Sequence, residues 1–178
     1  MIGVLVSGTG TNLQALLDAG LPVVAVASNK HGAPALARAP GIPTEAFELD
    51  NYSDRAERDR AMAEWLQGQG VELVVLAGYM HLLTGAFLDR FPDAIVNVHP
   101  SLLPDFPGAH AVEDQLAAGV TESGATVHLV DEGVDSGPIL AQERVPVHED
   151  DTPETLHERI KQIEHELLPR IVGELCAR

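Results

Sequence analysis

Short apolar runs alternate with amphipathic stretches through the first hundred residues of the chain. The pattern predicts strands at 2–6, 23–27, 44–47, 73–76 and 95–98, and helices at 11–19, 33–38, 53–69 and 84–90. Strands that alternate with helices typically form a parallel sheet with helices on both faces. We therefore predict an α/β fold of the Rossmann-like kind, built on a mostly parallel, twisted sheet.

The pattern changes after residue 120. Residues 125–130 and 139–145 are two strand-like runs joined by a turn rich in Asp, Gly and Pro, which predicts an antiparallel strand near the C-terminal part of the sheet. A long helix is expected next, with Thr152 as its N-cap and Pro153 at its first position. Because the 178 residues contain no internal repeat or linker, we expect a single domain over 1–178.

Charge and cysteine content limit the partners we expect. A net charge of −16 repels nucleic acid and anionic lipid, so neither a nucleic-acid nor a membrane partner is expected. Cys176 is the single cysteine and forms no intrachain disulfide, and the chain opens on a strand without a basic leader. These features favour a cytoplasmic location. No His or Cys spacing typical of metal ligands occurs, so no metal is predicted.

The run from Asn97 to Pro104 is the strongest chemical signal. Asn97 and His99 stand two residues apart where a buried strand ends, so their side chains are expected on the same side of it. An amide donates a hydrogen bond, and a protonated imidazole donates a second one that carries charge. This pair suits a developing oxyanion. A capping Asn beside a packed His is the structural alternative.

A glycine loop at residues 7–12 joins the first strand to the first helix. Gly10 permits a tight turn, and the N–H groups at the helix start, with the hydroxyl of Thr11, suit an anion. Leu13 stands where the third glycine of a dinucleotide motif belongs, and Lys30 lies where a ribose-binding acid is expected. We therefore predict a monophosphate site rather than a dinucleotide site, with an ordinary turn as the alternative.

A second turn, at residues 131–138, is expected near the same sheet edge. A carboxylate close to His99 would favour the imidazolium form and could help to move a proton. Asp135 is preferred to Asp131 because it lies deeper in the turn, although the sequence alone leaves that choice open. His128 lies within a predicted strand, where a histidine is more often packed or exposed than catalytic.

Together these motifs closely resemble those of the phosphoribosylglycinamide formyltransferase family, the folate-dependent transformylases of purine synthesis. The likeness covers nearly the whole chain. It is carried by segments 7–12, 28–30, 76–80, 97–104, 124–128, 134–138 and 164–165. The Asn-x-His-Pro-Ser-Leu-Leu-Pro run, followed by Asp-x-Gly-Pro, is specific for folate formyl transfer but does not separate members of the superfamily.

The resemblance implies transfer of the formyl group of 10-formyltetrahydrofolate to the amine of glycinamide ribonucleotide, in purine (IMP) biosynthesis. It implies catalytic roles for Asn97, His99 and Asp135. It implies that the ribonucleotide and its phosphate are bound by Gly10, Thr11, Asn12 and Glu164. It implies that the folate is bound by Arg55, Met80, His81, Leu82, Leu83, Asn97, Asp131, Glu132, Gly133, Val134 and Asp135.

Three other functions are alternatives. A formyltetrahydrofolate hydrolase, in which water replaces the amine, is the closest alternative, and the phosphate-like glycine loop favours the transferase. A methionyl-tRNA formyltransferase would need an RNA-binding domain and positive charge. A non-catalytic small-ligand binding protein belongs to a different class. The resemblance implies the ribonucleotide and the folate as small-molecule partners. A homodimer is possible.

Overall fold

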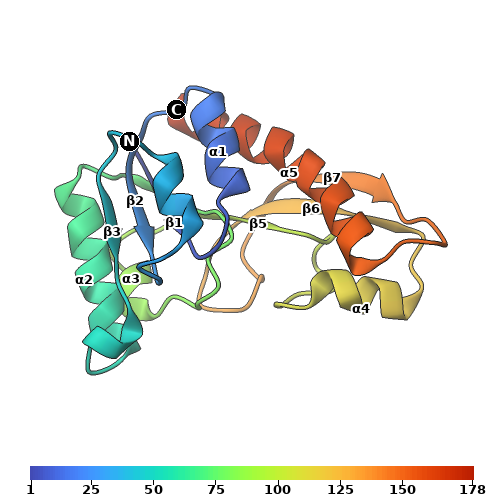
Figure 1. Ribbon diagram of the computed structural model, residues 1–178, viewed down its shortest axis with the longest axis horizontal. Coiled ribbons are helices and arrows are strands. Elements are labelled where there is room, and N and C mark those ends of the chain that lie inside the picture. The colour runs from blue at the N-terminus through green and yellow to red at the C-terminus, as the bar shows by residue number, and fades with distance from the viewer. The chain divides into compact units, whose positions relative to one another are not determined.

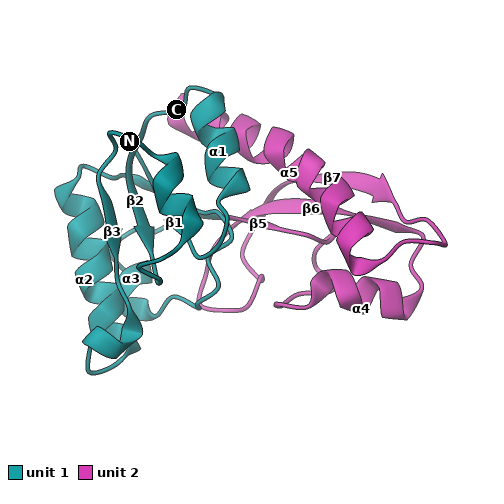
Figure 2. Cartoon of the chain, viewed as in Figure 1, with its two compact units in different colours: residues 1–96 teal, residues 97–178 magenta.

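The computed structural model describes residues 1–178. The backbone divides into two compact units, residues 1–96 and residues 97–178 (Figure 2). Each unit has its own sheet segment and its own helices. The expectation of a single domain over the whole chain stays a prediction.

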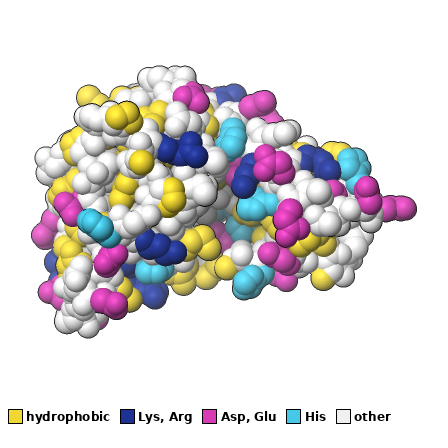
Figure 3. All heavy atoms as spheres, viewed as in Figure 1, with side chains coloured by type: hydrophobic (Ala, Val, Ile, Leu, Met, Phe, Trp, Pro, Cys, Tyr) yellow, Lys and Arg dark blue, Asp and Glu magenta, His cyan; other side chains and the backbone are white.

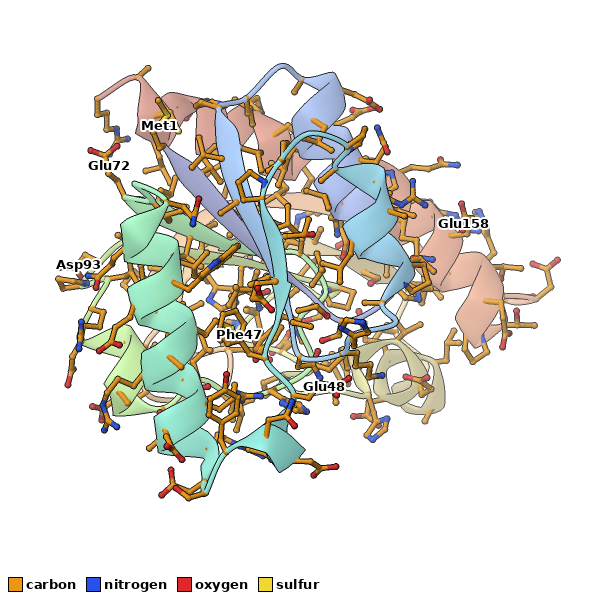
Figure 4. All side chains as sticks on the ribbon, turned by 60° about the vertical axis from the view of Figure 1, so that its left-hand side comes forward. Met1, Phe47, Glu48, Glu72, Asp93 and Glu158 are labelled. Atoms are coloured by element: carbon orange, nitrogen blue, oxygen red, sulfur yellow. The ribbon has the colours of Figure 1, made fainter.

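The first unit is built on four parallel strands. They are β1 (Ile2–Val6), β2 (Val23–Ser28), β3 (Thr44–Ala46) and β4 (Leu73–Leu76). They lie in the order β3-β2-β1-β4. All five residues of β1 are buried, as expected for a strand with neighbours on both sides. The N-terminal amine of Met1 pairs with Glu72 at 2.6 Å, at the start of β4 (Figure 4).

The helices of this unit connect the strands. They are α1 (Thr11–Asp18), η1 (Pro34–Arg38), η2 (Leu49–Asn51), α2 (Arg55–Gly68) and α3 (Gly85–Leu88). Helix α1 lies on one side of the strands and α2 on the other (Figures 1 and 4). The sequence predicts that helix α2 begins at Ser53, so that Asp54 would lie in its first turn. It is instead the N-cap, because its carboxylate accepts a hydrogen bond from the backbone N–H of Glu57 at 2.8 Å.

The second unit carries the antiparallel part of the fold. Its elements are β5 (Ile95–His99), which begins two residues before the unit does, α4 (Ala111–Ala118), β6 (Glu122–Leu129), β7 (Ile139–Pro146) and α5 (Pro153–Cys176). Strands β6 and β7 pair antiparallel. Helix α5 packs on both of them and also contacts α4 (Figure 1). The predicted α/β class, with an antiparallel strand in the C-terminal part, is confirmed.

The start of α5 follows the sequence prediction closely. The Thr152 hydroxyl accepts a hydrogen bond from the N–H of Thr155, the Thr155 side chain returns one to the N–H of Thr152, and Pro153 occupies the first turn. Arg159 binds Asp151 just before the helix, at 2.7 Å. This capping fixes where the helix begins.

The surface agrees with the acidic composition. On the visible face, acidic side chains are scattered over both units rather than gathered into one patch (Figure 3). None of the helices combines the length and the apolar character that crossing a membrane would require.

Candidate active site

His99 is the centre of a polar cluster in the second unit. It ends β5 and is 5% exposed. Its Nδ1 lies 3.4 Å from Oδ2 of Asp135, and its Nε2 lies 2.8 Å from the carbonyl oxygen of Phe106. Both ring nitrogens therefore face oxygen acceptors. A neutral ring has only one N–H to offer, so the protonated ring is the form that satisfies both contacts.

Asp135 lies in the turn between β6 and β7 with a positive φ of 52°. Its Oδ2 accepts a hydrogen bond from the N–H of Gly108 at 2.8 Å, and its Oδ1 lies 3.6 Å from Nε2 of His128. Burial opposes ionisation of this carboxyl. The hydrogen bonds from His128 and Gly108, together with the charge of His99, outweigh burial and lower its pKa below the usual value. Asp135 is therefore a carboxylate at neutral pH.

The choice between the two candidate acids follows from the geometry. Oδ1 of Asp131 accepts hydrogen bonds from the N–H of Gly133 at 2.9 Å and from the hydroxyl of Ser136 at 2.8 Å. Asp131 therefore shapes the turn, whereas Asp135 faces His99. Gly137 is required for the same turn, since a Cβ there would collide with the carbonyl of Leu129.

Asn97 joins the cluster from the same strand as His99. Its Nδ2 lies 3.3 Å from Nε2 of His128 and 3.5 Å from Oδ1 of Asp135. Asn97, His99 and Asp135 are thus brought together, as the sequence predicts. These contacts of the amide are long for hydrogen bonds, so an incoming oxygen can replace them at low cost.

Both donor groups of the pair are engaged within the protein. The Nε2–H of His99 is directed at the Phe106 carbonyl, and the Asn97 amide nitrogen faces His128 and Asp135. A substrate oxygen that binds here must take the place of these partners. The arrangement places a side-chain amide and an imidazole beside the two oxygens of one carboxylate.

The glycine loop lies in the first unit. The N–H of Ala35 donates to the carbonyl of Gly8 at 3.0 Å, and Nε of Arg38 donates to the carbonyl of Thr9 at 2.5 Å. Gly10 has a φ of 76° and is the N-cap of α1. The first-turn N–H groups of a helix have no acceptor within the helix. The predicted residues Thr11 and Asn12 lie at the start of α1, and the anion site itself stays a prediction.

The remaining predicted residues are divided between the units. In the first unit, Arg55 opens α2, and Met80, His81, Leu82 and Leu83 follow β4. In the second unit, Glu132, Gly133 and Val134 form the exposed part of the turn that contains Asp131 and Asp135, and Glu164 is buried on α5. Their roles stay predictions.

Several site residues were not found from the sequence. His128 is packed, at 2% exposed, as is common for a histidine within a strand, and it also lies within the cluster. The Phe106 carbonyl and the Gly108 N–H are backbone groups, which no residue pattern identifies. Arg58 on α2 is completely buried beside Asp59, and no sequence pattern singled it out.

Comparison with known proteins identifies relatives over almost the whole chain. Residues 1–172 match the family model described as formyl transferase. A phosphoribosylglycinamide formyltransferase from Haemophilus influenzae is 41% identical over 96% of this chain and 84% of its own length. The trifunctional purine biosynthetic protein adenosine-3 of Gallus gallus is 46% identical over 94% of this chain. The chain spans only 18% of that protein's length.

Solved structures give the same result. The crystal structure of glycinamide ribonucleotide transformylase 1 from Symbiobacterium toebii superposes with a TM-score of 0.94 and 47% identity. The match covers 96% of this chain and 84% of that one. A phosphoribosylglycinamide formyltransferase from Streptococcus pneumoniae superposes with a TM-score of 0.94 and 41% identity, over 98% of this chain and 97% of its own.

Proposed function

Because the chain belongs to the formyl transferase family, we propose that it transfers the formyl group of 10-formyltetrahydrofolate to the amine of glycinamide ribonucleotide, in purine biosynthesis. The observation that carries the proposal is the cluster of Asn97, His99 and Asp135, in which a side-chain amide and an imidazole both lie within 3.5 Å of one carboxylate. The names of the relatives, two of which are matched over most of their length, support the same substrates.

In the proposed reaction, the amine nitrogen of glycinamide ribonucleotide attacks the formyl carbon and forms a C–N bond. The carbonyl oxygen becomes a tetrahedral oxyanion, which accepts hydrogen bonds from Asn97 and from protonated His99. The bond from the formyl carbon to N10 of the folate then breaks. One proton leaves the attacking amine and one reaches N10, so atoms and charge balance. Asp135 keeps His99 charged and assists this proton movement, through water.

Binding is assigned to groups of residues on the same basis. The backbone around Gly10, with Thr11 and Asn12, holds the ribonucleotide phosphate, and Glu164 contacts the rest of that substrate. Arg55, residues 80–83 and residues 131–135 contact the folate. No covalent intermediate with the protein is required. The proposal includes a single formyltransferase domain over 1–178, located in the cytoplasm, with these two small molecules as partners and homodimer formation as a possibility.

The proposal is tested with 10-formyltetrahydrofolate that carries an isotope label in the formyl group. The protein is incubated with the labelled folate in the presence and in the absence of glycinamide ribonucleotide. Label in the formylated ribonucleotide, formed only when that acceptor is present, supports the transferase. Release of labelled formate without the acceptor indicates the hydrolase instead, and retention of all label on the folate contradicts both reactions.

A further inference from the structure

A closed ring of polar contacts lies beneath residues 80–84 in the first unit. Arg58 Nε donates to Asp59 Oδ1 at 2.7 Å, and Arg58 Nη1 lies 3.0 Å from Nδ1 of His81. The side-chain amide of Asn29 lies 3.2 Å from Nε2 of His81 and 2.5 Å from the hydroxyl of Ser7. The ring therefore connects α2, the end of β1 and the end of β2 to the segment that follows β4.

The two ends of the 80–84 segment are bound to this ring through their backbone. The N–H of Met80 donates to the Ser7 hydroxyl at 2.9 Å. The N–H and the hydroxyl of Thr84 both donate to Asp59 Oδ2, at 2.7 and 2.9 Å. His81 adds a third attachment near the middle. A short segment held at three points has little conformational freedom.

Most of this network is buried and His81 is half-buried, whereas the segment that it holds presents apolar side chains to solvent. Arg58 and Asp59 are 0% exposed. Met80 and Leu82 are 63% and 58% exposed, and they are two of only five large apolar side chains that the protein exposes. The segment is therefore attached by polar contacts on its inner side and presents Met80 and Leu82 on its outer side. Such a surface can bind an apolar ligand without first changing its conformation.

The protonation state of His81 follows from its neighbours. A guanidinium can only donate, so Nδ1 of His81 accepts from Arg58. The imidazole of His81 is therefore neutral and carries its hydrogen on Nε2. Nε2 of His81 then faces the side-chain amide of Asn29, whose oxygen accepts from the Ser7 hydroxyl. Burial, and then the charges of Arg58, Arg55 and Lys30, which outweigh the opposing charge of Asp59, lower the pKa of His81. A protonated ring would lose the Arg58 contact.

A buried arginine that served only stability would be a poor choice. An ion pair such as Arg58–Asp59 costs desolvation, and an apolar pair of similar volume is often at least as stable. The Arg58 guanidinium instead adds a specific contact to Nδ1 of His81. His81 belongs to the same segment as the exposed Met80 and Leu82.

We propose that Arg58 and neutral His81 are positioning residues for the formyl donor, because together they hold residues 80–84 in the conformation that binds it. This inference rests on the proposed function, in which this segment contacts the folate. Arg58 acts through the segment, and the imidazole of His81, which attaches the segment to Arg58, does not touch the reacting atoms. Their loss should therefore weaken donor binding and leave the chemical step and the other substrate unaffected.

Two substitutions at His81 separate the roles of its ring. His81→Phe keeps an aromatic ring against Tyr79, whose ring centroid lies 6.0 Å away, but removes the acceptor for Arg58. His81→Asn removes the imidazole, but its amide oxygen can replace Nδ1 as the acceptor for Arg58. We expect His81→Phe to raise KM for 10-formyltetrahydrofolate about tenfold, with kcat and KM for the ribonucleotide within about twofold. We expect His81→Asn to recover most of the loss.

Hydrogen exchange of the backbone amides of Met80 and Thr84, in the ligand-free protein, provides a readout that does not depend on activity. Exchange should be faster in His81→Phe than in the wild type and close to wild type in His81→Asn. An unchanged donor KM and unchanged exchange in His81→Phe would overturn the inference, as would an equal loss of all kinetic constants in both variants. If the wild type transfers no formyl group, the proposed function fails, and the exchange experiment still decides whether Arg58 and His81 hold the segment.

Discussion

The Nε2 atom of His99 lies 2.8 Å from the carbonyl oxygen of Phe106, and Nδ1 of the same ring lies 3.4 Å from Oδ2 of Asp135. In the proposed reaction, a formyl oxygen that binds Nε2 would take the place of this backbone carbonyl. Binding of the substrate requires an exchange of one oxygen for the other. In such an exchange the imidazole keeps a hydrogen bond, and the displaced Phe106 carbonyl keeps the Ser101 hydroxyl, 3.3 Å away, as a donor.

Asp135→Asn tests the contribution of the carboxylate. The amide has nearly the same shape but no charge, so it holds the protonated ring of His99 less strongly. We expect kcat for formyl transfer to fall by about 100-fold or more, while the protein stays folded. Steady-state kinetics with both substrates saturating measure this effect. Glu149→Gln removes a charge from an exposed position and serves as the control. Equal activity of the two variants would contradict the assignment.

The Asp135 carboxylate should also affect how the free energy of unfolding depends on pH in acid. The opposing effect of burial is outweighed by its hydrogen bonds, and the pKa of Asp135 is below its ordinary value of 3.8. The folded protein therefore binds this proton less tightly than the unfolded chain. The resulting stabilisation is complete above the ordinary value and is lost as the pH falls through the lower, folded value. Urea denaturation at several pH values below about 5 should show a steeper loss in the wild type than in Asp135→Asn. Parallel curves would refute this.

Two neighbouring glycines provide a matched test of the glycine loop. A Cβ at Gly10 would lie 2.5 Å from Cβ of Ala35, and the residue has a φ of +76°, whereas a Cβ at Gly8 meets nothing within 4 Å. We expect Gly10→Ala to lower the free energy of unfolding by about 1–3 kcal/mol. Gly8→Ala should change it by less than about 1 kcal/mol. Chemical denaturation of the two variants measures both values, and an equal effect would contradict the described packing of Gly10 against η1.

Sequence patterns were sufficient to predict the helices and strands whose formation depends on neighbouring residues in the chain. The parallel strands, the antiparallel pair and the cap at Thr152 follow from periodicity and from local hydrogen bonding. The shared side of Asn97 and His99 was also predictable, because the two residues stand two apart on one strand.

Other parts of the site could not be predicted because they depend on loop conformation. Phe106 and Asp135 both adopt positive φ values, of 51° and 52°, which their side chains do not favour and no sequence rule indicates. The contact of His99 with a backbone carbonyl follows from that conformation. The buried Arg58 was equally hidden, because its partners His81 and Asp59 are recognised only when the segment after β4 is placed against α2.

The rate of formyl transfer by His99→Ala and Asn97→Ala, measured with both substrates saturating, tests the central claim most directly. Removal of either donor to the oxyanion should lower kcat by about 100-fold or more, while the dissociation constant of glycinamide ribonucleotide stays within about twofold of the wild-type value. Near-normal turnover in either variant would show that the oxyanion is not stabilised by this amide and this imidazole, and the assignment of the active site would be wrong.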